Sequence, residues 1–202
     1  AVLIRNLFAL EHIEVSQIHG CVLSCVVPPL MMQFSHLCSK YLGITPLVVG
    51  PRISSGLTFD VENPDEMGSD RIANSLAATR TYGSPVIAIA FGTATTFDVV
   101  VDNVYVGGCI APGLGISSDA LFSLAARLYQ VELVRPPKVI ARNTVHHMQA
   151  GVIIGYTGLV EGIVARMHAE LGRQCPVVVT GGLADVIAKE TAIITAVAVS
   201  YT

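Results

Sequence analysis

The segment from Pro85 to Asp98 constrains the fold of this chain most. It is an apolar run that stops at Gly92 and continues as hydroxyl residues, Pro-Val-Ile-Ala-Ile-Ala-Phe-Gly-Thr-Ala-Thr-Thr-Phe-Asp. A short apolar run bounded by glycine predicts a buried strand. A strand that ends in Gly92-Thr93 can turn tightly and present backbone N–H groups and hydroxyls to a phosphate. We therefore expect a phosphate-binding turn there, with a simple hairpin turn as the alternative.

Composition limits the class of protein. The chain has 202 residues, of which 52% are hydrophobic and 13% charged, so it can bury one good core or two small ones. The net charge of −3 and the absence of clustered Lys and Arg argue against a nucleic-acid surface. No run approaches the roughly 18 uninterrupted apolar residues of a membrane span. Small molecules or protein partners are therefore expected instead.

The five cysteines indicate a compartment. They lie in apolar segments without a Cys-x-x-Cys pair, so neither a disulfide framework nor a zinc site is predicted. Reduced core cysteines are typical of a cytoplasmic protein, and we expect that location.

Apolar runs alternate with Gly and Pro breakers, which predicts an α/β fold with a mixed sheet. Helices are expected at 1–10, 30–42, 65–81, 116–128, 144–171 and from 183 onward, and strands at 18–27, 46–50, 57–61, 86–91, 96–101, 104–110 and 176–180. Ser117 or Ser118 should cap the fourth helix, and Asn143 or Thr144 the fifth. The first helix has no capping residue ahead of it, so we expect further residues upstream of Ala1.

Glycines recur along the long helix predicted at 144–171. Each costs helix propensity, so close packing against another helix is the most physical explanation for them. This face is a candidate homodimer interface, formed by Gly151, Gly155, Gly158 and Gly162.

Five motifs in order and spacing give the chain a resemblance to a known family. They are Gly68-Ser69-Asp70-Arg71, Phe91-Gly92-Thr93-Ala94-Thr95-Thr96, Gly107-Gly108-x-x-Ala111-Pro112-Gly113, Asn143-Thr144 and Thr180-Gly181-Gly182-Leu183-Ala184. Together they resemble type III pantothenate kinase over nearly the whole chain. The resemblance implies the actin-like, hexokinase-like ATPase (ribonuclease H-like) fold in two similar mixed-sheet halves, here residues 1–84 and 85–202.

The same resemblance implies an activity and a set of site residues. Family members phosphorylate pantothenate with ATP and Mg²⁺ in the first step to coenzyme A, and they work as dimers with a monovalent cation, K⁺ or NH₄⁺. Asp70 is implied as the general base, which suits a carboxylate beside a primary alcohol. The implied pantothenate contacts are Gly68, Ser69, Asp70, Arg71 and Thr144, and the implied ATP contacts are Gly92, Thr93, Gly181 and Gly182.

Each residue has a structural alternative. Asp70 and Arg71 can be a surface pair early in a helix, Gly181-Gly182 a simple strand exit, and Thr144 only a helix cap. Adjacent His146 and His147 face different directions on a helix, so they make a poor metal pair.

The chain also departs from the family pattern. Nothing in it corresponds to the N-terminal strand and Asp-x-Gly-Asn-Thr phosphate loop of the family, so the N-terminal strands are missing from it. Ala90 stands where the family has its cation-binding aspartate, so no metal ligand is predicted there, and Val61 replaces a usual tyrosine. A non-catalytic or regulatory relative that keeps the fold is therefore the alternative to a kinase. Another phosphotransferase or phosphohydrolase of the same fold is a weaker one.

Overall fold

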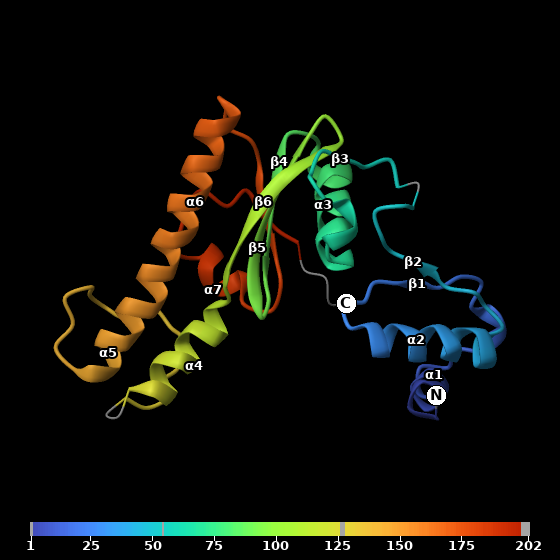
Figure 1. Cartoon of the computed structure of the whole chain (residues 1–202). Helices are drawn as coiled ribbons and strands as arrows, with labels where there is room; N and C mark the ends of the chain where they lie inside the picture. Colours follow the sequence, from blue (N-terminus) through green and yellow to red (C-terminus); the bar gives the residue numbers. More distant parts are fainter. Residues whose placement is uncertain (1, 54, 126–127, 199–202) are drawn as a thin grey trace. The chain divides into compact units, whose positions relative to one another are not determined.

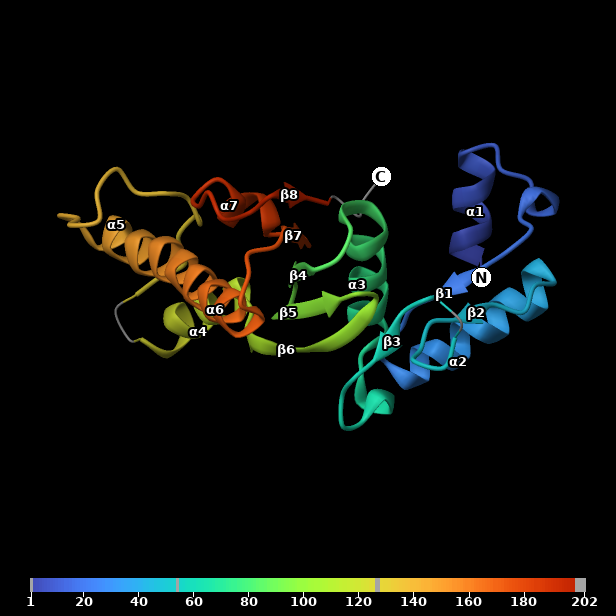
Figure 2. The same cartoon turned by 90° about the horizontal axis from the view of Figure 1, so that it is seen from above.

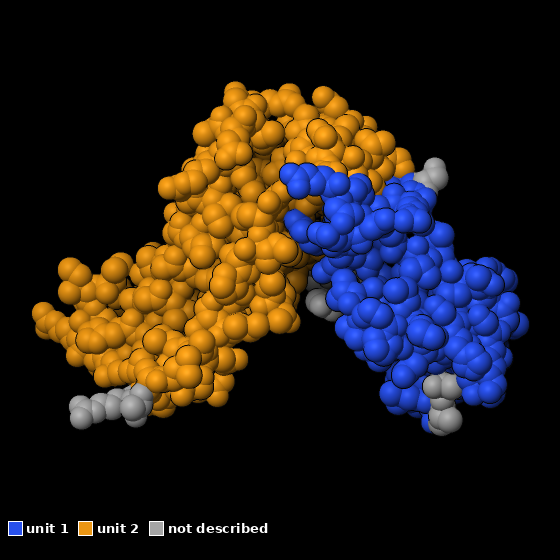
Figure 3. All heavy atoms as spheres, viewed as in Figure 1, with its two compact units in different colours: residues 1–55, 62–73 blue, residues 56–61, 74–202 orange. Residues whose placement is uncertain are grey.

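The computed structural model describes residues 2–53, 55–125 and 128–198. They form two compact units, coloured separately in Figure 3: unit 1 comprises residues 1–55 and 62–73, and unit 2 comprises residues 56–61 and 74–202. Both units combine helices with a sheet, as the predicted α/β class requires. The predicted halves, 1–84 and 85–202, describe the family's two repeats and stay a prediction.

A mixed six-stranded sheet forms the centre of unit 2 (Figures 1 and 2). Its order is β3 (Thr58–Phe59), β6 (Val104–Pro112), β5 (Ala94–Val101), β4 (Val86–Phe91), β7 (Val177–Thr180) and β8 (Ala196–Val197). The meander β4–β5–β6 is antiparallel, whereas β7 runs parallel to β4. The predicted mixed sheet and its three consecutive strands are confirmed.

The core of unit 2 lies between this sheet and α6 (Gly155–Leu171). Ile87, Phe97 and Val179 point from the strands to Val160 and Val164 of the helix, and all five side chains are buried. The helices α4 (Leu114–Leu124) and α7 (Ala184–Ala188) add Leu114 and Ile187 to the same cluster. On the opposite face of the sheet lies α3 (Ser69–Tyr82), of which residues 74–82 belong to unit 2 (Figure 2).

Unit 1 has a parallel pair of short strands, β1 (Val22–Leu23) and β2 (Leu47–Val48). Its helices are α1 (Val2–Leu10) and α2 (Pro28–Leu37), and α2 continues as a π turn, η2 (Cys38–Leu42), to Gly43. Gly43 adopts a φ of 69°, the left-handed conformation in which helices commonly end. The 3-10 turns η1 (Val15–Gln17) and η3 (Pro64–Glu66) complete the unit.

Three element predictions are wrong in detail. The buried strand expected at 18–27 is reduced to β1, and Val22 is 67% exposed, because β1 pairs only with β2. The helix expected from residue 65 begins at Ser69, after η3. The helix expected at 116–128 begins at Leu114 with Gly113 as its cap, so neither predicted serine caps it. The helix ends at Leu124, before the predicted end at residue 128, and residues 126 and 127 between these positions lie outside the described residues.

One long helix of 28 residues spans Thr144–Leu171 as α5 (Thr144–Gln149), a π turn η4 (Ala150–Ile154) and α6. Among the described residues it alone is long and apolar enough to cross a membrane. However, half of its most apolar window is buried inside the protein, and Tyr156, Val160 and Val164 pack into the core of unit 2. It therefore has the environment of a core helix.

Asn143 caps this long helix, and its removal should lower stability. The Asn143 side chain accepts a hydrogen bond of 2.8 Å from the backbone N–H of His146. Asn143→Ala should lower the free energy of unfolding by about 0.5–2 kcal/mol, measured by urea denaturation. Thr144→Ala is the matched control, because Thr144 is the first helical residue and not the cap. Equal losses for both variants would contradict the assignment.

Candidate functional site

The predicted phosphate turn is present in unit 2. Gly92 and Thr93 connect β4 to β5, and both are exposed, whereas Phe91 and Thr95 on either side are buried. The Gly92 N–H donates to the Ala94 carbonyl at 3.1 Å, which tightens the turn. The turn therefore offers an accessible hydroxyl and backbone on a rigid base.

Gly181 and Gly182 lie beside this turn. Because β7 runs parallel to β4, with Thr180 opposite Ala90, the residues after both strands meet at the same edge of the sheet. Gly181 adopts a φ of 102°, and a Cβ placed on it would lie 2.8 Å from the carbonyl carbon of Phe91. Gly182 has open space around it and is exposed. The structure thus brings together the four predicted ATP contacts.

Gly113 is a further member of this group that was not predicted as a site residue. Its N–H donates to the Thr93 carbonyl at 3.1 Å, and a Cβ on it would lie 2.8 Å from the carbonyl carbon of Thr93. It also caps α4, an eleven-residue helix whose N-terminus therefore adjoins the turn. Its presence in one of the five motifs was the sequence signal that could have revealed it.

Ala90 lies two residues before the turn, at the position of the family's cation-binding aspartate. Its cross-strand neighbours are Thr96 and Thr180. The nearest carboxylate along β5, Asp98, is fully buried and already accepts hydrogen bonds from Thr96 and Tyr105. Among the residues that the structure describes, no three His, Cys, Asp or Glu side chains gather as a metal site. The residues at Ala90 therefore do not fit a cation.

The predicted pantothenate motif lies in unit 1, at the start of α3. The Ile72 N–H donates to the Gly68 carbonyl at 3.2 Å, so Gly68 stands at the helix N-terminus. The Asp70 carboxylate folds back into space that a side chain on Gly68 would fill. Asp70 is exposed, Arg71 is half-buried, and buried Ser69 accepts a hydrogen bond of 3.0 Å from Ser24. Gly68 thus makes room for an accessible carboxylate.

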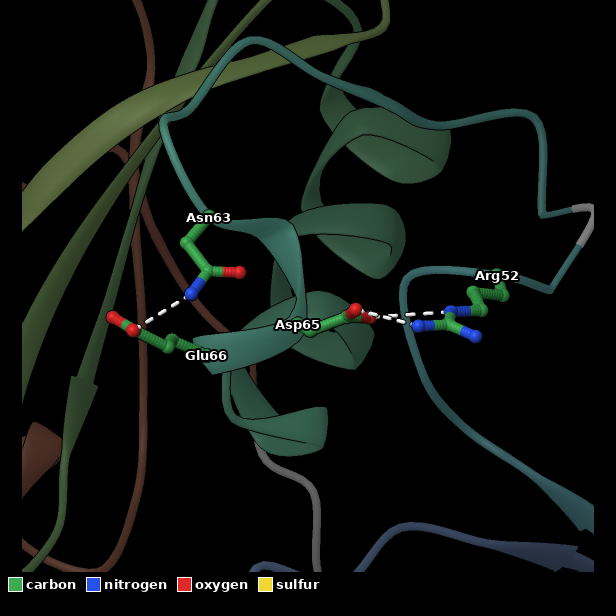
Figure 4. Close-up of polar contacts among 4 residues, drawn as sticks. All are labelled: Arg52, Asn63, Asp65 and Glu66. Carbon is green, nitrogen blue, oxygen red and sulfur yellow. Dashed lines mark hydrogen bonds and ion pairs between the residues drawn. The ribbon is translucent and has the colours of Figure 1, made fainter.

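An exposed ion pair joins two segments that precede this motif (Figure 4). Arg52 contacts both carboxylate oxygens of Asp65, at 2.6 and 3.2 Å. This hydrogen bonding holds the pKa of Asp65 below its ordinary value. Within the same turn Asn63 donates to Glu66 at 2.7 Å. Arg52 therefore connects the loop after β2 to the turn before α3.

Thr144 and the two histidines lie on α5. Thr144 is exposed at the first helical position, so it is free of the capping role that Asn143 fills. His146 lies against the Asn143 side chain at 3.2 Å, and His147 is near the Ala141 carbonyl at 3.1 Å. Both histidines therefore belong to the local structure of the helix start, and among described residues they join no metal group.

The sequence matches one family along most of its length. A family model described as type III pantothenate kinase matches residues 1–166. A type III pantothenate kinase from Roseiflexus sp. is 63% identical over 97% of this chain and 77% of its own length. The corresponding protein from Roseiflexus castenholzii is 64% identical with the same coverage, and that from Moorella thermoacetica is 49% identical over 93% of this chain and 74% of its own.

A solved structure supports the same fold. A protein from Campylobacter jejuni, described as a "conserved putative Baf family transcriptional activator", superposes with a TM-score of 0.57 over 91% of this chain and 77% of that one. At 18% identity this likeness concerns the fold alone. The family model and the identity to these relatives show that the chain belongs to the type III pantothenate kinase family.

Proposed function

We propose that this chain transfers the γ-phosphoryl group of ATP to the primary hydroxyl of pantothenate, which gives 4′-phosphopantothenate, the first step of coenzyme A biosynthesis. The observation that carries the proposal is the convergence of Thr93, Gly113 and Gly181 at one edge of the sheet, in a member of this kinase family. The comparisons give no support to the alternative of a regulatory relative.

Asp70 is the proposed general base. A carboxylate within hydrogen-bond reach of the pantothenate hydroxyl accepts its proton as the oxygen attacks the γ-phosphorus. The accessibility of Asp70 and the space that Gly68 leaves for it support this role. We propose that Ser69, Arg71 and Thr144 contact pantothenate. The guanidinium group of Arg71 suits the carboxylate of that substrate.

The turn of unit 2 supplies the proposed nucleotide contacts. The exposed Thr93 hydroxyl and the backbone of Gly92 would hold phosphate oxygens, and Gly181 and Gly182 would let the backbone approach the nucleotide from the neighbouring strand. Positioning and charge stabilisation supply most of the catalysis in phosphoryl transfer. The rigid turn suits that requirement.

Cations enter this proposal in two ways. Membership of the kinase family implies ATP with a divalent cation, for which we propose Mg²⁺. The monovalent cation, K⁺ or NH₄⁺, is expected from the family resemblance, but the residues around Ala90 do not fit it.

The proposed function can be tested directly. ADP release from ATP should depend on pantothenate in a coupled assay of the purified chain, with product identified by mass spectrometry. Parallel reactions with and without K⁺ or NH₄⁺ show whether a monovalent cation is needed. Absence of turnover with every cation, together with clear ligand binding by calorimetry, would favour the non-catalytic alternative.

A homodimer through the long helix is part of this proposal. Gly151, Gly155 and Gly158 are exposed, and a Cβ on any of them would meet nothing within 4 Å. They therefore leave a surface on which a second helix can pack closely. A cytoplasmic location also stays a prediction.

Gly155→Leu should convert the dimer to a monomer. Leucine improves helix propensity, so the protomer should stay folded, while the larger side chain blocks close approach of a partner helix. Sedimentation velocity at micromolar concentration measures the change. Gly20→Leu is the matched control, because Gly20 is also exposed in open space but lies in unit 1. A monomeric wild-type chain would contradict the proposed interface.

A further inference from the structure

The Tyr156 hydroxyl joins a helix to two strands in unit 2. Tyr156 lies near the start of α6 and is 7% exposed. Its hydroxyl donates to the Pro112 carbonyl at 2.9 Å and lies 2.5 Å from the hydroxyl of Thr95, which is fully buried. Since the phenol has one proton and Pro112 takes it, the Thr95 hydroxyl donates to the Tyr156 oxygen. Both bonds therefore have a fixed direction.

The partners of Tyr156 flank the phosphate turn. Thr95 follows Thr93 by two residues at the start of β5, and Pro112 immediately precedes Gly113. Gly113 in turn donates its N–H to the Thr93 carbonyl at 3.1 Å. On the other side of the turn, the ring of Phe91 at the end of β4 lies 6.4 Å from the Tyr156 ring, centroid to centroid. One side chain thus contacts all three strand ends that hold Gly92 and Thr93.

We propose that Tyr156 is a positioning residue for the nucleotide phosphates, which fixes the place of the Gly92-Thr93 turn through Thr95 and Pro112. This inference rests on the proposed function of the turn. Displacement of a binding group by about 1 Å can cost roughly 100-fold in rate, so a side chain that fixes the turn affects catalysis without touching the substrate.

The hydroxyl and the ring of Tyr156 have separable effects. Phenylalanine would fill the same apolar space, since the ring packs into the core cluster with Phe91. It would leave the buried Thr95 hydroxyl without its acceptor, and a buried polar group that loses its partner is costly. Burial also raises the pKa of the Tyr156 phenol, so it stays a neutral donor at physiological pH. Loss of the hydroxyl should therefore loosen the turn more than the core.

Tyr156→Phe in the full chain tests the inference by two measurements. In the coupled assay, kcat/KM for ATP should fall by roughly 10- to 100-fold while the KM for pantothenate stays within about twofold. In the ligand-free protein, hydrogen exchange of the Gly92 and Gly113 amides should become at least about tenfold faster, with the amides of the Ile89–Phe97 pair in the middle of the ladder unchanged.

Tyr105→Phe is the matched control. Tyr105 is another buried tyrosine of the same sheet, whose hydroxyl donates to Asp98 at 2.7 Å near the start of β6, far along the strand from Pro112. The Tyr105→Phe variant should lower the midpoint temperature of unfolding without a selective change in the KM for ATP. A second comparison is a double-mutant cycle of Tyr156 and Thr95. The double variant Tyr156→Phe/Thr95→Val should lower the free energy of unfolding and the kcat/KM for ATP little more than Tyr156→Phe alone, because the two side chains share one hydrogen bond.

The outcomes are distinct. Uniformly faster exchange across the sheet, or a KM for pantothenate that rises as much as the KM for ATP, would show a merely structural tyrosine and overturn the inference. A wild-type chain without kinase activity would overturn the proposed function instead, and the exchange measurement would still decide whether Tyr156 holds the turn.

Discussion

Replacement of Asp70 by asparagine is expected to abolish phosphorylation of pantothenate and leave the fold unchanged. The amide has the shape of the carboxylate but cannot accept the proton of the substrate hydroxyl, and general-base catalysis contributes about 10²- to 10⁴-fold. Asp70 is exposed in the first turn of α3, so its neutralisation removes only a favourable helix-end charge, about 1 kcal/mol at most. Coupled ADP release and thermal unfolding measure the two effects separately.

Asp65→Asn provides the control for Asp70→Asn. Asp65 lies five residues earlier, is also exposed, and pairs with Arg52 (Figure 4). Loss of the Arg52–Asp65 ion pair should change the free energy of unfolding only slightly, because an exposed ion pair contributes little to stability. The kcat should stay within about twofold of the wild-type value. Retention of more than about a tenth of the wild-type kcat by Asp70→Asn would exclude Asp70 as the base.

The sequence predicted most reliably those elements whose signal is local. The strands of the β4–β5–β6 meander are apolar runs separated by turn residues, and Asp102 and Asn103 join the last two with φ angles of 51° and 60°. The cap at Asn143 is equally local. The prediction of a buried strand at 18–27 was wrong because an apolar run does not reveal how many neighbouring strands will pair with it. In the structure β1 pairs with β2 alone.

The sequence identified some residues of the candidate site but not the contacts that bring them together. Gly92, Thr93 and Gly181 were expected from the motifs of a resembling family, and their meeting depends on β7 lying parallel to β4. The contact of Gly113 with Thr93 depends on a register that places Pro112 opposite Ala94. Tyr156 is 61 residues from Thr95 in the sequence, so no local pattern could connect them. The contacts that the sequence did not predict are therefore those between residues far apart in the chain, which depend on how the strands and α6 pack together.

Gly181→Ala is expected to disrupt both the edge of the sheet and nucleotide binding. The φ of 102° is a conformation that L side chains rarely adopt, and a Cβ would also lie 2.8 and 2.9 Å from the carbonyl carbon and the nitrogen of Phe91. Backbone cannot move aside as a flexible side chain can, so β4 and β7 would have to separate where the turn begins. The strain alone should lower the free energy of unfolding by about 1–3 kcal/mol.

The effect on ATP should exceed what lost stability explains. Because Phe91 directly precedes Gly92, any shift of its backbone moves the phosphate turn, and the Kd for ATP measured by calorimetry at a temperature where the variant is folded should rise at least about tenfold. Gly182→Ala is the matched control: its Cβ would meet nothing within 4 Å, so it should stay near wild type in stability. If Gly181→Ala bound ATP as tightly as the wild-type chain, the edge shared by β4 and β7 would not be the nucleotide site, and the roles proposed for Thr93 and Tyr156 would fall with it.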